Sequence, residues 1–117
     1  LEDRLIDFAV RVIRTAESLP KTRSGKHISG QLIRCGTSPA ANYGEAQSAE
    51  SRADFIHKIK ICLKELREAK VWLDIIARSN LIRHPLKLES LINEANELIS
   101  IFVKSVKTAR QQGANTS

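Results

Sequence analysis

Hydrophobic residues recur every three or four positions through most of the chain, which is the spacing of one face of an α-helix. The first such segment covers about 2–19, where charged residues such as Arg11 and Arg14 occupy the opposite, polar face. The third and fourth segments, about 52–79 and 86–111, alternate spacings of four and three, a heptad pattern typical of left-handed helix packing. The heptad positions are Phe55, Ile59, Cys62, Leu66, Ala69, Leu73 and Ile76, then Leu88, Ile92, Ala95, Ile99, Phe102, Val106 and Ala109.

Residues that start or stop helices stand between these segments. Pro20 ends the first, and Ser24 is a plausible N-cap for the second. Ser51 can cap the third helix, and Asn80 can close it in a left-handed conformation. Pro85 can begin the fourth, because its missing donor does not matter at a first helical position. The sequence therefore predicts four helices with short connections.

Strand signals are absent, since no alternating β-branched and aromatic run lies between turn residues. The fold class predicted is all-α, an antiparallel up-down-up-down, left-handed four-helix bundle spanning 1–111 as one domain. The small polar residues of 112–117 are expected to be disordered. Leu91, Leu98 and Val103 broaden the apolar face of the fourth helix beyond one bundle seam, which favours homo-oligomerisation.

The segment 34–45, Arg-Cys-Gly-Thr-Ser-Pro-Ala-Ala-Asn-Tyr-Gly-Glu, interrupts the second helix with residues that disfavour a helix interior. Pro39 removes a backbone donor and crowds the preceding turn, so we expect a proline kink or short break near 35–38. Two interpretations of Thr37 and Asn42 stay open here. They either hydrogen-bond backbone groups freed by the kink, or they form a polar pocket between subunits.

Tyr43 and Trp72 are the aromatic residues with the clearest interface potential. Tyr43 follows the proline on the apolar side of the second helix and is expected to be partly buried with a partner for its hydroxyl. Trp72 falls off the heptad seam of the third helix. Since a lone exposed Trp is unfavourable, we expect it to contact another subunit or the first helix.

The chain is basic, with a formal net charge of +6 and a pI of about 9.7, which favours polyanionic partners. Glu68 and Asp74 stand four residues after Lys64 and Lys70, so part of the third helix reads as a paired, solvated face. Basic residues near the end of the fourth helix also suit its dipole without any ligand. Candidate nucleic-acid-binding residues are Lys21, Arg23, Lys26, Lys60, Lys64, Arg67, Lys104, Lys107 and Arg110.

Nothing in the sequence indicates catalysis. Cys35 and Cys62 fall at apolar helix positions and read as buried thiols in a reducing cytoplasm. His27, His57 and His84 are scattered rather than set at metal-ligand spacing. Glu65 and Glu68 stand three apart without the histidine of a di-iron motif, so ion pairs are expected. No nucleotide-binding glycine loop or membrane-length apolar run occurs, and we expect a cytoplasmic protein without enzyme activity, metal or cofactor.

Three segments resemble a known family. They are 34–46, which extends the proline segment to Ala46, Ser-Arg-Ala-Asp-Phe at 51–55, and Leu-Lys-Glu-Leu-Arg-Glu-Ala at 63–69. They resemble the four-helix-bundle proteins encoded in intervening sequences of bacterial large-subunit ribosomal RNA. Tyr43 and Gly44 stand where that family usually has Ile and Ala. The resemblance covers most of the chain, with the fourth helix matched only by pattern.

This resemblance implies a left-handed up-down bundle that assembles into a ring, a pentamer in known members. It also implies kinship with the accessory variability determinant of diversity-generating retroelements, a basic barrel that binds nucleic acid and partners a reverse transcriptase. The motif positions carried over are structural or interface residues: Arg34, Pro39, Asn42, Glu45, Phe55 and Leu66.

Two functions follow as hypotheses. The first is a non-enzymatic homo-oligomer that binds structured nucleic acid, RNA in preference, through its basic residues. Few aromatic residues are available to stack on single-stranded bases. The alternative is a structural or adaptor protein whose partner is another protein, such as a reverse transcriptase.

Overall fold

The computed structural model describes residues 1–116, with side chains as far as Gly113, and contains four helices in that range. Within it no residue is in a strand, which confirms the all-α prediction. The helices are α1 (Glu2–Glu17), α2 (Arg23–Gln47), α3 (Arg52–Arg78) and α4 (Pro85–Thr116).

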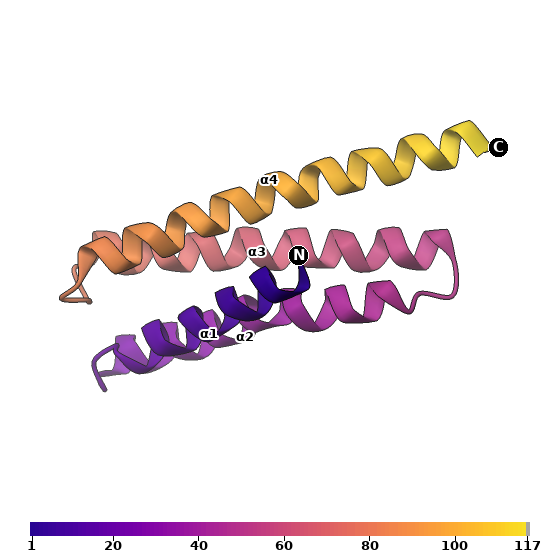
Figure 1. Cartoon of the computed structure of the whole chain (residues 1–117). Coiled ribbons are helices and arrows are strands. Elements are labelled where there is room, and N and C mark those ends of the chain that lie inside the picture. The colour runs from indigo at the N-terminus through magenta and orange to yellow at the C-terminus, as the bar shows by residue number, and fades with distance from the viewer. Residues whose placement is uncertain (117) are drawn as a thin grey trace.

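The four helices lie side by side in an elongated body of 53 × 21 × 21 Å, and the chain reverses direction at each connection (Figure 1). Each helix packs along the next one in sequence, and α1 also touches α4, though over a smaller area. The left-handed twist expected from the heptads stays a prediction.

A single apolar core runs along the bundle and draws on all four helices. The heptad positions of α3 are buried as predicted from Ile59 to Ile76, whereas Phe55 is half-buried. In α4 the sequence placed Ile92 and Ile99 at the centre of the seam. The structure instead buries Leu91 and Leu98 almost completely and leaves the two isoleucines half-buried. The buried face of α4 is therefore rotated relative to the predicted seam.

Most helix ends were predicted correctly. Ser51 caps α3, its hydroxyl accepting from the Asp54 amide at 3.1 Å, and Asn80 has a positive φ of 54°. The predicted N-cap Ser24 is wrong, because Thr22 adopts extended backbone and its Oγ1 accepts from the Gly25 amide at 3.1 Å. The capping oxygen must precede the first helical residue, and Ser24 already lies inside α2.

The C-terminal end of α4 extends further than the sequence predicted. The predicted helix ended at Gln111, and disorder was expected over 112–117. The structure continues the helix to Thr116, and Ser117 lies outside the described residues. Gly113 lies beside the start of α3, since a Cβ added there would sit 3.5 Å from the Arg52 Cδ.

The proline segment does not break α2, which stays helical from Arg23 to Gln47. The expected break near 35–38 is thus absent, and a bend at Pro39 stays a prediction. Thr37 donates to the Ile33 carbonyl at 2.7 Å, and Asn42 donates to the Ser38 carbonyl at 3.0 Å. Both side chains bond backbone of their own helix, though not the Cys35 carbonyl that Pro39 leaves without its usual donor.

Candidate nucleic-acid interface

A row of cations lies along the outer face of α3. Lys60, Lys64 and Arg67 recur at the i, i+4, i+7 spacing of one helix face, and all three are exposed. Among the described residues none of them forms an ion pair. Their charge is therefore available to a partner.

Three acids of α3, Glu65, Glu68 and Asp74, pair with other basic residues, so they leave this row unpaired. Glu68 was expected to pair with Lys64, but it contacts the Arg34 guanidinium of α2 instead. Arg34 also reaches Glu65 at 3.2 Å, so the ion-pair prediction for both glutamates is confirmed. Lys70 and Asp74 pair at 3.0 Å as the sequence predicted.

The second basic group, Lys104, Lys107 and Arg110, is exposed on α4. Gly113 of α4 lies beside Arg52 of α3, and the two helices run in opposite directions. Lys60 comes eight residues after Arg52, so it lies level with the part of α4 that comes eight residues before Gly113. That segment is centred between Lys104 and Lys107. Lys60 and Lys64 of α3 thus lie in the same half of the bundle as the α4 cations, and Arg67 lies near its middle.

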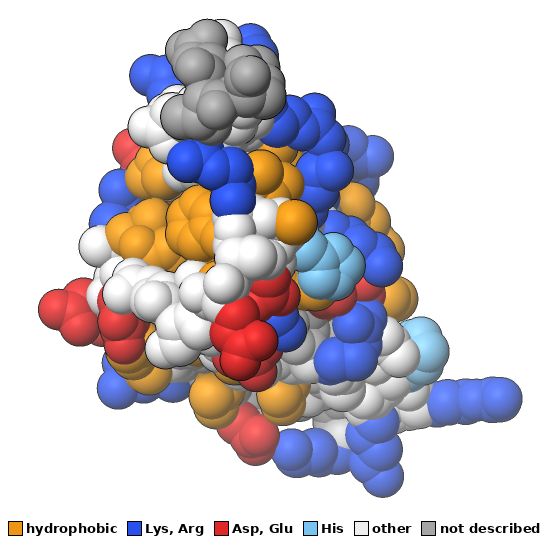
Figure 2. Space-filling model, turned by 90° about the vertical axis from the view of Figure 1, so that its right-hand side faces the viewer, with side chains coloured by type: hydrophobic (Ala, Val, Ile, Leu, Met, Phe, Trp, Pro, Cys, Tyr) orange, Lys and Arg blue, Asp and Glu red, His pale blue; other side chains and the backbone are white. Residues whose placement is uncertain are grey.

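The orientation of α4 agrees with this. Glu94 lies on the side of α4 that faces α1, since it accepts a hydrogen bond from Arg4 of α1. At about 100° per residue, Lys107 and Arg110 point more than a third of a turn away from that side, whereas Lys104 points less than a quarter of a turn away. Figure 2 looks onto the end where α4 finishes and shows Lys and Arg side chains gathered beside that end and down one flank.

We call these six residues the basic α3–α4 surface; they are Lys60, Lys64, Arg67, Lys104, Lys107 and Arg110. The remaining predicted cations do not join it. Lys21 precedes α2, and Arg23 and Lys26 lie in its first turns, at the opposite end of the bundle from the end of α4 (Figure 1). The structure therefore divides the nine predicted cations into two groups.

The motif residue Arg34 holds a polar network between α2 and α3. Besides the two glutamates it contacts Gln31 at 3.1 Å. Trp72 donates its indole N–H to the same Glu68 at 3.1 Å, and its ring meets His27 edge-on with centroids 5.8 Å apart. Of the two partners expected for Trp72, the first helix is wrong, because the ring packs against His27 of α2 and α1 does not contact α3. Contact with another subunit stays a prediction.

Other motif positions stabilise the bundle. Glu45 pairs with Lys58 of α3 at 2.7 Å, and Leu66 is fully buried. Pro39 is buried, and its carbonyl accepts from the Cys62 thiol at 3.4 Å. Tyr43 is half-buried, with its ring edge-on to Phe102 at 6.0 Å. These contacts fit the structural role that the resemblance implied.

The cysteines offer no reactive site. Cys35 and Cys62 are free and buried, and burial raises the pKa of each thiol to about 12. Across the described residues His, Cys, Asp and Glu do not gather in groups of three that could hold a metal ion. No helix in that range is both long and apolar enough to cross a membrane.

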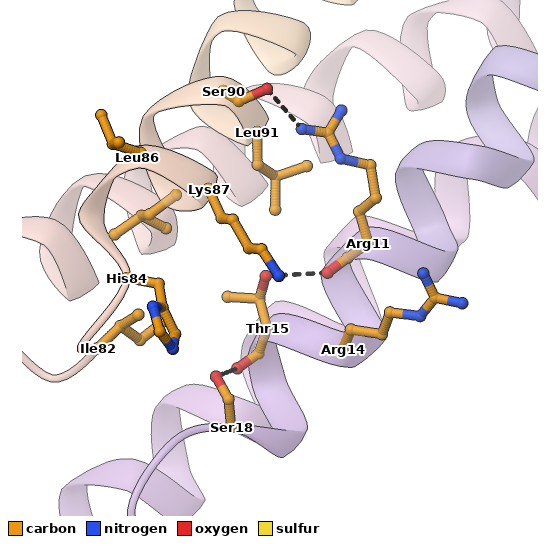
Figure 3. Close-up of a pocket in the computed structure, with 11 residues that line it drawn as sticks. Arg11, Arg14, Thr15, Ser18, Ile82, His84, Leu86, Lys87, Ser90 and Leu91 are labelled. Carbon is orange, nitrogen blue, oxygen red and sulfur yellow. Dashed lines mark hydrogen bonds between the residues drawn. The ribbon is translucent and has the colours of Figure 1, made fainter.

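Sequence reasoning missed a cavity between α1 and α4 (Figure 3). Arg11 and Arg14 of α1 were assigned only to a polar face, yet they line this cavity together with His84 and Lys87. These residues come from segments about 70 positions apart. Only the packing of α4 beside α1 brings them together, so the sequence carried no local signal for the cavity.

Comparison with known proteins shows the family of the chain. The family model of the 23S rRNA-intervening sequence protein matches residues 3–104, from α1 into the second half of α4. The chain belongs to the 23S rRNA-intervening sequence protein family. The family match therefore includes α4 as far as residue 104, whereas the resemblance reached this helix only by pattern.

A solved structure supports the fold of this family member. It is a protein with unknown function from the S23 ribosomal protein family of Bacteroides thetaiotaomicron. The two are 36% identical, with a TM-score of 0.83, over 91% of this chain and 97% of the other. The search of curated proteins found no match.

Proposed function

We propose that this protein is a non-catalytic homo-oligomer that binds structured RNA through the basic α3–α4 surface. The observation that carries the proposal is the row Lys60, Lys64 and Arg67, which is exposed and unpaired. The acids Glu65, Glu68 and Asp74 of the same helix pair with Arg34 and Lys70 instead. Cations without acidic neighbours are suited to phosphate contacts.

The shape of the surface favours a folded RNA over a single strand. All five Phe, Tyr and Trp side chains are buried or half-buried, so none presents an open ring on which bases could stack. Lysine and arginine side chains on helices can contact the phosphates and 2′-hydroxyls of a duplex without reading base edges. We therefore expect recognition by shape and charge.

Oligomerisation would multiply this charge. Supporting it, α1 exposes Ile6, Val10 and Ile13 at helical spacing, a stripe that a second copy of the chain could cover. The up-down left-handed bundle and the pentameric ring implied by the resemblance are part of the same proposal. A cytoplasmic location would suit an RNA partner.

A filter-binding titration of a structured RNA at two salt concentrations tests the proposal. Six cations in contact with phosphates would give a slope of log K against log salt of about −4 to −5. The variant Lys60→Glu/Lys64→Glu/Arg67→Glu should abolish binding while the helical circular dichroism signal is kept. The matched control Lys21→Glu/Arg23→Glu/Lys26→Glu makes the same charge change at the other end and should bind with most of its affinity.

Three results would contradict the proposal: no retention of RNA, a response that does not change with salt, or equal loss of binding in both triple variants. The alternative, an adaptor for another protein, predicts a partner that is recovered in a pull-down after nuclease treatment.

A further inference from the structure

A hollow lies between α1 and α4, near the connection that precedes α4. Its volume is about 560 Å³, within the range of small-molecule sites. Thr15 and Ser18 lie on one wall, Lys87 and Ser90 on the other, and Ile82 belongs to the connection (Figure 3).

The polar lining is cationic. Its charged side chains are those of Arg11, Arg14 and Lys87, which lie beside His84, and no Asp or Glu is among the lining residues. Lys87 extends from α4 toward α1, whereas Arg11 reaches from α1 to α4 (Figure 3). Arg11 and Lys87 thus bring positive charge to the hollow from two helices, while the Arg14 guanidinium points away from Lys87 (Figure 3). Positive charge without an acidic partner in the lining favours an anionic ligand.

The hydroxyls add directed hydrogen bonds. Arg11 Nη2 donates to Ser90 Oγ at 2.9 Å, which fixes the guanidinium and leaves the Ser90 proton free to donate to a ligand. Thr15 donates to the Arg11 carbonyl at 2.9 Å and Ser18 to the Thr15 carbonyl at 2.7 Å. Those two hydroxyls have therefore used their protons, and among these three hydroxyls Ser90 is the one that can donate to a phosphate.

The rest of the lining is apolar, from Ile82, Leu86, Leu88 and Leu91. Leu86 is 80% exposed, the most open of the large hydrophobic side chains in the described range. An inorganic ion would leave this surface in water, whereas a ligand with a ring or apolar body would cover it. The hollow thus has one part suited to binding an anion and another suited to an apolar group.

A neighbouring hollow limits the size of the ligand. It has a volume of about 450 Å³ and shares Arg11, Leu86 and Ser90 with the first, but it is lined by Glu89, Glu94 and Glu97. A nucleic-acid backbone that continued along the groove would meet these carboxylates and be repelled. The groove therefore suits a short anion that ends at Arg11.

We propose that the hollow between α1 and α4 binds a small organic phosphate, with its phosphate groups between Arg11 and Lys87, beside Arg14, and its body against Leu86 and Leu91. The site lies on different helix faces from the basic α3–α4 surface and is independent of the RNA-binding proposal.

Isothermal titration calorimetry with adenosine 5′-diphosphate tests the site, with adenosine and inorganic pyrophosphate as the two half-ligands. We expect the diphosphate to bind more tightly than either half. Backbone amide shifts in NMR spectra should concentrate at Thr15, Ser18, Lys87 and Ser90. The double variant Arg14→Ala/Lys87→Ala should weaken binding at least about tenfold, since each charge-assisted hydrogen bond can contribute about that factor.

The matched control is Lys60→Ala/Lys64→Ala, which removes the same charge from α3 and should leave the affinity for adenosine 5′-diphosphate unchanged. Both pairs are exposed and lack ion-pair partners among the described residues, so the fold should persist in each variant. The proposal is overturned if the diphosphate fails to bind, if either half-ligand binds as tightly, or if the two double variants weaken binding equally. Amide shifts confined to α3 would also overturn it.

Discussion

At the scale of single residues, Gly36 sets how closely α1 and α2 approach. A Cβ built on Gly36 would lie 2.5 Å from Val12 Cγ1, and Val12 is itself fully buried. Such a contact is too short for any side chain, so the backbone of α2 is pressed against the side chain of α1. Gly30 and Gly44 lie in the same helix but have nothing within 4 Å of an added Cβ.

The substitution Gly36→Ala should therefore destabilise the protein by about 1–3 kcal/mol, because the added methyl group forces the two helices apart. Gly30→Ala, at an open helical position, should instead stabilise it by about 0.5–1 kcal/mol. Urea unfolding followed by circular dichroism measures both. If Val12→Ala in the Gly36→Ala background fails to recover stability, the clash with Val12 is not the cause.

The two thiols should be inert in the folded state. With each pKa raised to about 12 by burial, the thiolate fraction at pH 8 is about one in ten thousand. Ellman's reagent should therefore modify native Cys35 and Cys62 slowly at pH 8 and rapidly once guanidinium chloride unfolds the chain. Fast modification without denaturant would show that the core around α2 and α3 opens readily.

At the scale of elements, the boundaries that the sequence predicted correctly are those fixed by one residue's backbone chemistry. Ser51, Asn80 and Pro85 each act alone and were placed correctly. The cap of α2 was missed because Thr22 and Ser24 are both capable capping residues, and the choice depends on which one adopts extended backbone. The connection also passes close to the new helix, since the Pro20 carbonyl oxygen would lie 1.9 Å from a Cβ added at Gly25.

Replacement of the two candidate caps separates them. Thr22→Ala should cost about 1 kcal/mol, since the Gly25 amide loses its acceptor. Ser24→Ala should be close to neutral, because Ser24 is exposed and inside the helix. Chemical denaturation midpoints of the two variants give the comparison, and a larger loss for Ser24→Ala would refute the assignment.

The contact between α1 and α4 should depend on pH. The hydrogen bond from Arg4 lowers the pKa of Glu94, so this pair stabilises the fold above the ordinary glutamate pKa. The contribution is lost as the pH falls through the lowered pKa. Glu94→Gln should thus reduce stability at pH 7 and have no effect at pH 2.

The control for this prediction is Glu89→Gln, which removes an exposed carboxylate of α4 that forms no ion pair in the described part of the chain. It should be near neutral at both pH values. The midpoints of urea unfolding of the two variants, measured from pH 2 to pH 7, test whether the Glu94 charge is responsible. A Glu94→Gln effect that persists at pH 2 would assign the loss to packing rather than charge.

At the scale of the whole molecule, the helical period predicted most of the core, because burial in a bundle follows directly from which residues share a helix face. It could not predict the division of the basic residues into two groups. That division depends on the register between α3 and α4 and on which acids Arg34 draws away from Lys64. The hollow lined by Arg11 and Lys87 could not be predicted from the sequence for the same reason, since it is formed by residues of different helices.

Assembly is the remaining question at this scale, and α1 gives the sharpest test. Ile6, Val10 and Ile13 are 45%, 38% and 41% exposed and follow one another at spacings of four and three. The first helix therefore has a buried stripe and a second, open apolar stripe, whereas a surface helix of a monomer normally exposes polar residues there. A second copy of the chain would bury this stripe and gain the hydrophobic free energy of its area.

Val10→Glu should dissociate the assembly into subunits of 13.1 kDa, because a carboxylate cannot be buried at an apolar contact without a partner. Light scattering coupled to size-exclusion chromatography measures the mass, and circular dichroism checks that the helices persist. The control Val71→Glu places the same charge on α3, where Val71 is 55% exposed. If α1 forms the interface, that variant stays assembled. If the wild-type protein elutes with the mass of a single subunit, the apolar stripe of α1 is exposed to solvent. That result would contradict assembly into a ring.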